Sequence, residues 1–219
     1  MTSTLWMAGA SGLVGQSVMA SLLAEGAPWR VESFGRRALG QTHPRLREHT
    51  VDFARFDSGD AAEPAVALCT LGTTLARAGS REAFRAVDFS AVLEFATAAY
   101  AHGASRFVLC SAHGADPSSA LFYNRVKGEV ERAVEDIGFE AVAVVRPSLL
   151  LGDRSETRGV ERLAIVVSRA LKSALGWLPS RPIEAATVAR AMVKLAAEAQ
   201  PGVRVWSNDE LHTLGAAPL

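Results

Sequence analysis

The sequence is poor in cysteine, with Cys69 and Cys110 the two thiols among its 219 residues. Two thiols are too few for the disulfide framework of a small secreted protein or for a cysteine-rich zinc site, and we expect no bound metal. We interpret both as buried free thiols that serve as small apolar side chains, with a redox pair as the alternative.

An excess of charge of one sign is also absent, because 23 Lys and Arg residues balance 23 Asp and Glu residues. This balance argues against a nucleic-acid partner and against a polybasic membrane anchor. The most apolar runs, 141–145 and 163–167, are too short to cross a bilayer, and the N-terminus shows no targeting pattern. We therefore expect a cytoplasmic protein with no nucleic-acid or membrane partner.

Hydrophobic residues make up 49% of the chain, which excludes a disordered protein, and the length fits one domain over residues 1–219. We expect strands at 4–8, 29–34, 47–53, 65–71, 106–110, 141–146 and 203–206, and helices at 12–25, 80–102, 117–137, 160–175 and 187–199. The helix at 117 is predicted from Asp116 as its N-cap and Pro117 in its first turn. The alternation predicts an α/β fold, a parallel sheet with helices on both faces, in which residues 148–219 contribute a small substrate-side portion.

A glycine-rich turn joins the first strand to the first helix. Gly9, Gly12 and Gly15 let backbone N–H groups approach a pyrophosphate at the positive end of the helix, and let the helix pack close to the sheet. We favour dinucleotide binding over a ligand-free turn because the strand–turn–helix context is right. The predicted cofactor loop comprises Gly9, Ala10, Ser11, Gly12, Leu13, Val14 and Gly15.

Two arginines, Arg36 and Arg37, follow the second strand, where NAD-binding sites usually carry a carboxylate for the ribose. A guanidinium group binds a 2′-phosphate through paired hydrogen bonds and stacks on adenine. We therefore favour NADP(H) as the cofactor, with NAD(H) as the alternative. The other interpretation of this pair is a solvated loop with two surface charges.

Tyr123 and Lys127 are four residues apart in a predicted helix and therefore share one face. A neighbouring ammonium group favours the phenolate, so we expect Lys127 to lower the pKa of Tyr123. Ser111 follows the fifth strand, where its hydroxyl would hold a substrate oxygen. The three residues predict a hydride-transfer site in which Ser111 orients the substrate, Tyr123 passes the proton and Lys127 tunes it. The alternative is an exposed Tyr/Lys pair on a helix surface.

Several motifs along the chain resemble one known superfamily. The loop at 9–15, Ser111 and Tyr123-Asn124-Arg125-Val126-Lys127 are similar to the short-chain dehydrogenases/reductases, in their extended or atypical branch. Cys-Thr-Leu-Gly-Thr-Thr at 69–74, Ser-Ala-His-Gly-Ala-Asp at 111–116, Val-Lys-Gly-Glu-Val-Glu at 126–131, Arg146-Pro147 and Gly-Asp-Arg at 152–154 resemble the HIV Tat-interacting-protein-like group of that branch.

The resemblance implies a Rossmann-type, doubly wound sheet that binds NADP(H), and a homodimer formed through the helices at 80–102 and 117–136. It implies further cofactor contacts from Asp52 and Phe53 at the adenine, Leu71, Gly72 and Thr73 at the adenosine, and Pro147 and Ser148 at the nicotinamide. The sequence departs from the pattern at Asp88, where many extended members carry an asparagine that serves a proton relay.

We expect an NADP(H)-dependent oxidoreductase acting on a small carbonyl or alcohol, because little chain follows the sixth strand. His113, Arg154 and Arg158 are the candidate substrate contacts. One alternative is a cofactor-binding regulatory or redox-sensing module with little turnover. Another is an epimerase or dehydratase with a recycled cofactor, although no additional acid or base for it is identified near the nicotinamide.

Overall fold

A seven-stranded parallel sheet organises the chain, as seen in a computed structural model that describes residues 3–152, 181–198 and 200–216. The strand order is β3-β2-β1-β4-β5-β6-β9. The strands are β1 (Ser3–Ala8), β2 (Trp29–Gly35), β3 (Leu46–Thr50), β4 (Val66–Cys69), β5 (Arg106–Cys110), β6 (Ala141–Val145) and β9 (Gly202–Trp206). The order reverses direction between β1 and β4, which makes this the switch point where doubly wound sheets bind ligands. The predicted Rossmann-type fold is confirmed.

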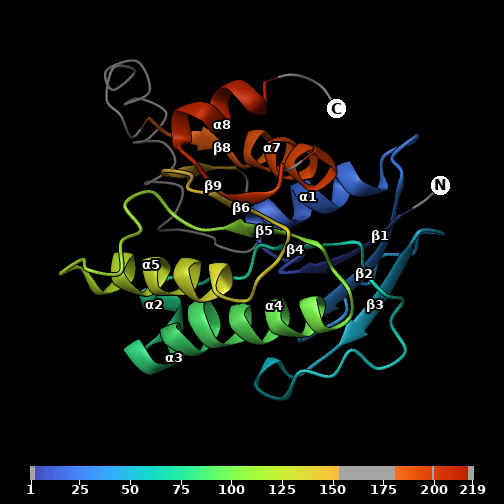
Figure 1. Cartoon of the computed structure of the whole chain (residues 1–219), viewed down its shortest axis with the longest axis horizontal. Coiled ribbons are helices and arrows are strands. Elements are labelled where there is room, and N and C mark those ends of the chain that lie inside the picture. Colours follow the sequence, from blue (N-terminus) through green and yellow to red (C-terminus); the bar gives the residue numbers. More distant parts are fainter. Residues whose placement is uncertain (1–2, 153–180, 199, 217–219) are drawn as a thin grey trace.

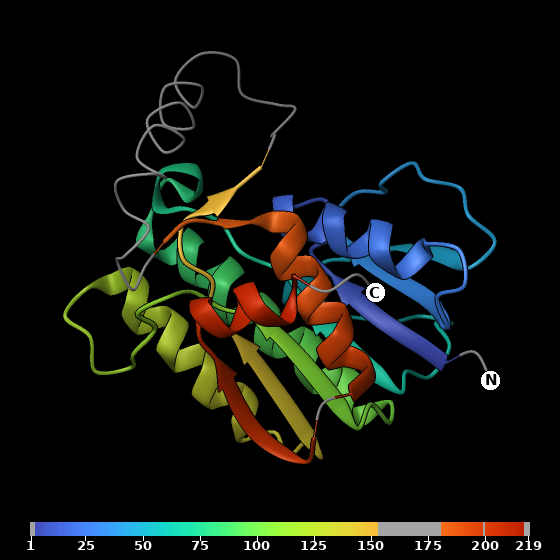
Figure 2. The ribbon, with the colours of Figure 1, turned by 90° about the horizontal axis from the view of Figure 1, so that it is seen from above.

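Helices cover both faces of the sheet (Figures 1 and 2). One face carries α1 (Leu13–Leu23), α7 (Ala185–Glu198) and α8 (Asn208–Leu214). The other carries α4 (Ala91–Ala101) and α5 (Phe122–Glu135), and α4 continues an unbroken helix from α3 (Arg81–Arg85) through a π turn (Ala86–Ser90). Short elements complete the described chain: a 3-10 turn (Phe53–Arg55), α2 (Leu75–Ala78) and the paired strands β7 (Leu150–Leu151) and β8 (Ile183–Glu184).

The sheet separates two apolar cores, because successive side chains of a strand point to opposite faces. Along β1, Leu5 and Met7 join the core under α1 and α7, whereas Trp6 and Ala8 join the core under α4. The second core is aromatic, and Trp6, Phe34, Phe95 and Phe107 are fully buried in it. Burial on both faces explains why the central strands read as continuous apolar runs.

Two predicted boundaries are wrong by three residues or more. The helix predicted at 117–137 is α5, and it begins at Phe122 rather than Pro117. The Asp116 carboxylate accepts hydrogen bonds from the backbone N–H and hydroxyl of Ser118 and closes a turn instead of capping a helix. The third strand ends at Thr50 instead of Phe53, since Asp52 accepts from the Ala54 N–H and opens the 3-10 turn. The predicted helix at 160–175 lies outside the described residues.

Among the helices that the structure describes, none is both long and apolar enough to cross a membrane.

The end of α1 is held by one side chain: the Arg45 guanidinium donates to the carbonyl oxygens of Leu23 and Ala24 at 2.7 and 2.6 Å. A cation is favourable at this position, because the last carbonyl groups of a helix lack partners within it.

Candidate functional site

The glycine-rich turn lies at the carboxyl edge of the sheet, between β1 and α1. Gly9 has φ +91°, and a Cβ placed on it would lie 2.5 Å from the Thr70 carbonyl carbon, so only glycine fits. A Cβ on Gly15 would lie 2.1 Å from the Gly9 oxygen, which brings the first turn of α1 directly against the loop. Gly12 is the N-cap of α1 and contributes no capping side chain, so the helix end is open to a ligand.

Thr70, at the end of β4, fixes this turn. Its hydroxyl lies 3.2 Å from the Ala8 carbonyl oxygen and 3.0 Å from that of Gly9. Ser11 and Gly12 are exposed, whereas Ala10, Val14 and Gly15 are buried and form the base of the loop. Leu13 packs against the chain that leaves β7, since a Cβ on Gly152 would lie 2.8 Å from its Cδ1.

The residues proposed for the adenosine side differ in their surroundings. Arg36 and Arg37 follow β2 and are exposed, in keeping with a role in binding an external anion. Asp52 is exposed, whereas Phe53 is only 6% exposed and stacks on Phe56 with ring centroids 5.8 Å apart. Phe53 therefore lies in the aromatic core, with little surface left for a ligand.

Lys127 is buried in an ion pair that the spacing of the sequence did not predict. Its Nζ lies 2.6 Å from Oδ1 of Asp88, and the two side chains are 6% and 0% exposed. Oδ2 of Asp88 accepts a hydrogen bond from the Thr73 N–H at 2.8 Å. Burial lowers the pKa of the Lys127 ammonium, but the charge of Asp88 and the Tyr123 phenol more than compensate and leave that pKa above its usual value.

Tyr123 stands one turn before Lys127 on α5, and its ring packs on Phe84 with centroids 5.5 Å apart. Burial raises the pKa of its phenol; Lys127 acts in the opposite direction and Asp88 in the same direction as burial. Lys127 therefore lowers the pKa of Tyr123 as expected, but burial outweighs the ammonium charge and leaves that pKa above its usual value.

Ser111 follows β5 and is buried, with its hydroxyl donating to Oε1 of Glu131. Glu131 in turn accepts from Arg146, whose Nη2 lies 2.5 Å from Oε2. A serine hydroxyl has one proton, and here that proton is directed to the carboxylate. Ser111 therefore presents acceptor lone pairs to its surroundings and can donate to a substrate only by rotating away from Glu131.

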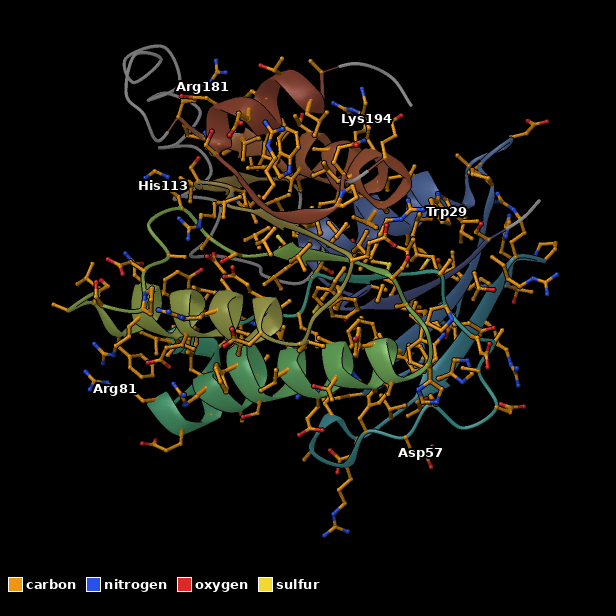
Figure 3. All side chains as sticks on the ribbon, in the orientation of Figure 1. Trp29, Asp57, Arg81, His113, Arg181 and Lys194 are labelled. Atoms are coloured by element: carbon orange, nitrogen blue, oxygen red, sulfur yellow. The ribbon has the colours of Figure 1, made fainter. Side chains whose placement is uncertain are left out.

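The chain after β6 is tied to the same edge. The Pro147 carbonyl accepts from the His113 N–H at 2.9 Å, and Asn208 accepts from the Ser148 N–H at 2.9 Å. The Ser148 hydroxyl donates to the Arg181 carbonyl oxygen. Figure 3 shows His113 and Arg181 at one end of the molecule and Trp29, which begins β2, toward the other. Arg154 and Arg158 lie outside the described residues.

The two cysteines end neighbouring strands β4 and β5 and are free thiols. Burial raises the pKa of Cys69 to about 12 and that of Cys110 to about 11, although Lys127 opposes both shifts. Both therefore remain neutral thiols near pH 7. In the part of the chain that the structure describes, no group of three or more His, Cys, Asp or Glu side chains is arranged to hold a metal ion.

These features fit a dinucleotide. The turn at 9–15 admits no side chain at Gly9 or Gly15, so its backbone is free to contact a pyrophosphate at the α1 N-terminus. The 71–73 segment and α5 border the same edge of the sheet, where Lys127 supplies a cation. The fold and this site define an NAD(P)-binding protein of the short-chain dehydrogenase/reductase type.

Solved structures share the fold. MoeE5 in complex with UDP-glucuronic acid and NAD has a TM-score of 0.71 at 17% identity, over 97% of this chain and 81% of that one. UDP-glucose 4-epimerase from Thermotoga maritima has a TM-score of 0.68 at 14% identity, over 97% of this chain and 81% of that one. At identities this low, the comparison shows a shared fold and nothing further.

No family model matches the sequence. Protein HTATIP2 of Rattus norvegicus is 36% identical over 195 residues, which cover 87% of this chain and 79% of that protein. The mitochondrial protein FMP52 of Coccidioides immitis is 33% identical over 242 residues, covering 97% and 96% of the two chains. The chain belongs to the family of HTATIP2 and FMP52, an atypical short-chain dehydrogenase/reductase group, as its motifs indicated.

The expectation of a cytoplasmic protein is wrong by this comparison, because the fungal relatives are named as mitochondrial proteins. Composition and thiol content do not separate the two locations, since neither requires disulfides or a charge excess.

Sequence reasoning missed the carboxylates that partner the candidate site residues. The departure from the family pattern at Asp88 gives no indication of its partner Lys127, and the motifs give Glu131 no role. Glu131 stands one helical turn after Lys127 on α5, so the same spacing that selected Tyr123 also placed Glu131 on that face. Arg146, at the end of β6, has no such local signal.

Proposed function

We propose that the protein is an NADP(H)-dependent oxidoreductase acting on a small carbonyl or alcohol. The observation that carries this proposal is the joint position of two features at one edge of the sheet. The open glycine turn at 9–15 ends β1, and the buried Lys127 ammonium lies beside Gly72, just past the end of the adjacent β4. Tyr123 stands one turn away on the same helix.

The bound nicotinamide would supply or accept the hydride. Tyr123 donates its phenolic proton to the substrate oxygen during reduction and takes a proton back from an alcohol in the reverse direction. Lys127 stabilises the phenolate that forms when the proton leaves. Ser111 lies at the end of the neighbouring strand, where its oxygen accepts a hydrogen bond from a substrate hydroxyl.

Replacing Tyr123 by Phe removes the proton donor and keeps most of the buried ring. We expect Y123F to lose at least about a hundredfold in kcat for NADPH-dependent reduction across a panel of aldehydes and ketones. NADPH affinity, measured by calorimetry, stays near that of the parent. The control is Y100F, since Tyr100 is 45% exposed on α4 and should change neither quantity. Unchanged turnover in Y123F would contradict the mechanism. No turnover in the parent, with NADPH still bound, would favour the regulatory module.

The preference for NADP(H) is proposed from Arg36 and Arg37, which are positioned after β2 to bind a 2′-phosphate. We expect the parent to bind NADPH at least about tenfold more tightly than NADH, and the R36A/R37A variant to lose that difference. The control is R30A, an exposed arginine near the opposite end of β2. Tighter binding of NADH by the parent would rule out the assigned roles.

The homodimer that the family resemblance implies is likewise a proposal, with α4 and α5 as the interface. A groove of about 290 Å³ lies on this side of the molecule, between the π turn and α5, and Phe89, Pro117 and Ala133 contribute its apolar lining. The mass in solution by light scattering tests it.

A further inference from the structure

One buried carboxylate of the site has no assigned role. Asp88 is fully buried; it binds Lys127 through one carboxylate oxygen and the Thr73 N–H through the other. A Cβ on Gly72 would lie 3.4 Å from Asp88 Oδ1 and 3.5 Å from Lys127 Nζ. The ion pair therefore lies directly beneath the backbone of the segment that follows β4.

The local backbone around Asp88 is unusual. Residues Ala86–Ser90 form a π turn between α3 and α4, and Asp88 is at its centre. A π turn inserts one residue into a helix, and such insertions are frequent at functional sites. The π turn packs against α5, so the inserted segment delivers the carboxylate to Lys127.

The charges that face Tyr123 are few. Among the described residues, those acting on its phenol are Lys127 from α5, Asp88 from the π turn and the Cys110 thiol from β5. Lys127 also faces the Cys69 thiol from β4. Both thiols are neutral near pH 7, so the two charges next to the phenol are opposite in sign and are bound to each other.

We propose that Asp88 is a positioning residue that holds Lys127 and offsets its charge, so that Tyr123 enters the reaction as a protonated donor and not as a phenolate. The inference rests on the proposed function for its meaning in catalysis. In the reductive direction the O–H bond of Tyr123 breaks, its proton forms the new O–H bond of the product alcohol, and the phenolate later regains a proton from water. An asparagine would leave the Lys127 charge uncompensated and favour the phenolate.

The sequence allows a direct test without cofactor or substrate, because Tyr100 and Tyr123 are its only tyrosines. In a Y100F background, ultraviolet absorbance of the phenolate against pH reports Tyr123 alone. Relative to that parent, D88N should lower the pH midpoint of the Tyr123 titration by at least about one pH unit. D88E, which keeps the charge, should restore the parental midpoint. Circular dichroism at each pH confirms that the protein stays folded.

Removing one member of a buried ion pair is destabilising, so a second variant covers the case in which D88N does not fold. D88N/K127M removes both charges, and its midpoint should equal that of the parent because the two effects cancel. A midpoint about one unit or more above the parent would show that Lys127 acts uncompensated, and would overturn the proposal. An unchanged midpoint in folded D88N would do the same.

The result is independent of turnover. A shifted midpoint in D88N with no activity in the parent would support the role of Asp88 and reject the proposed reductase. Loss of turnover in Y123F with an unchanged midpoint in D88N would support the reductase and reject the role of Asp88.

Discussion

At the scale of single residues, buried carboxylates bind two of the side chains that are expected to act on the substrate, Lys127 and Ser111. Asp88 binds Lys127, and Glu131 accepts from Ser111 and Arg146. Buried charge is stable only when it is paired and hydrogen-bonded, so each carboxylate fixes the orientation of its partner. The site therefore holds its polar groups in a preorganised network.

Removing the charge of Glu131 should destabilise the fold. E131Q leaves the Arg146 guanidinium with a weaker acceptor in a buried site, and we expect a loss of about 2 kcal/mol in the free energy of unfolding by urea. E129Q is the matched control, because Glu129 and its partner Arg85 are 30% and 43% exposed and such pairs contribute under about 1 kcal/mol. Equal losses in the two variants would mean that burial of the Glu131 network adds no stability.

The residues found from sequence are those with a local signal. Gly9, Gly12 and Gly15 follow a strand, and Tyr123 and Lys127 share a helix face. The partners Asp88 and Arg146 come from elements distant in the chain. Contacts between such elements depend on how the elements are oriented relative to each other in the fold. Residue spacing in the sequence does not predict that orientation. The raised pKa of Tyr123 was missed for the same reason, because burial is a property of the packed molecule.

At the scale of elements, all seven strands of the sheet were predicted, whereas the start of α5 was not. The apolar runs of the central strands allow few interpretations other than a buried strand, whereas Asp116-Pro117 fits the start of a helix as well as a turn. The reason for the turn lies further along the chain. A Cβ on Gly128 would lie 2.2 Å from the Pro117 nitrogen, so α5 packs directly on the loop at 116–117.

This contact predicts a reversal of ordinary helix preference. Alanine in place of glycine inside a helix normally stabilises it by about 1 kcal/mol. We expect G128A to lower the free energy of unfolding instead, because the new methyl group overlaps the backbone at Asp116 and Pro117. A133G, at a half-buried position of the same helix, should cost the usual amount of about 1 kcal/mol. A stabilised G128A in a urea titration would show that the loop moves aside freely.

At the scale of the whole molecule, the sheet divides the structure into two cores that meet the site from opposite faces. Alternation of strands and helices predicted a covered parallel sheet, but it is compatible with several strand orders. The order with β4 beside β1 is what places Thr70 against Gly9 and Gly72 above Lys127. The neutral net charge likewise conceals a site where opposite charges are paired and two exposed arginines stand after β2.

The packing of α7 on α1 has a consequence for the order in which the chain acquires structure. The apolar face of the helix that follows the glycine turn is covered by residues 185–198, which a ribosome adds long after α1. Contacts between such distant segments form slowly, because a long loop must close first. A nascent chain therefore exposes the face of α1 until α7 is complete, and the glycine turn becomes rigid only after that late contact has formed.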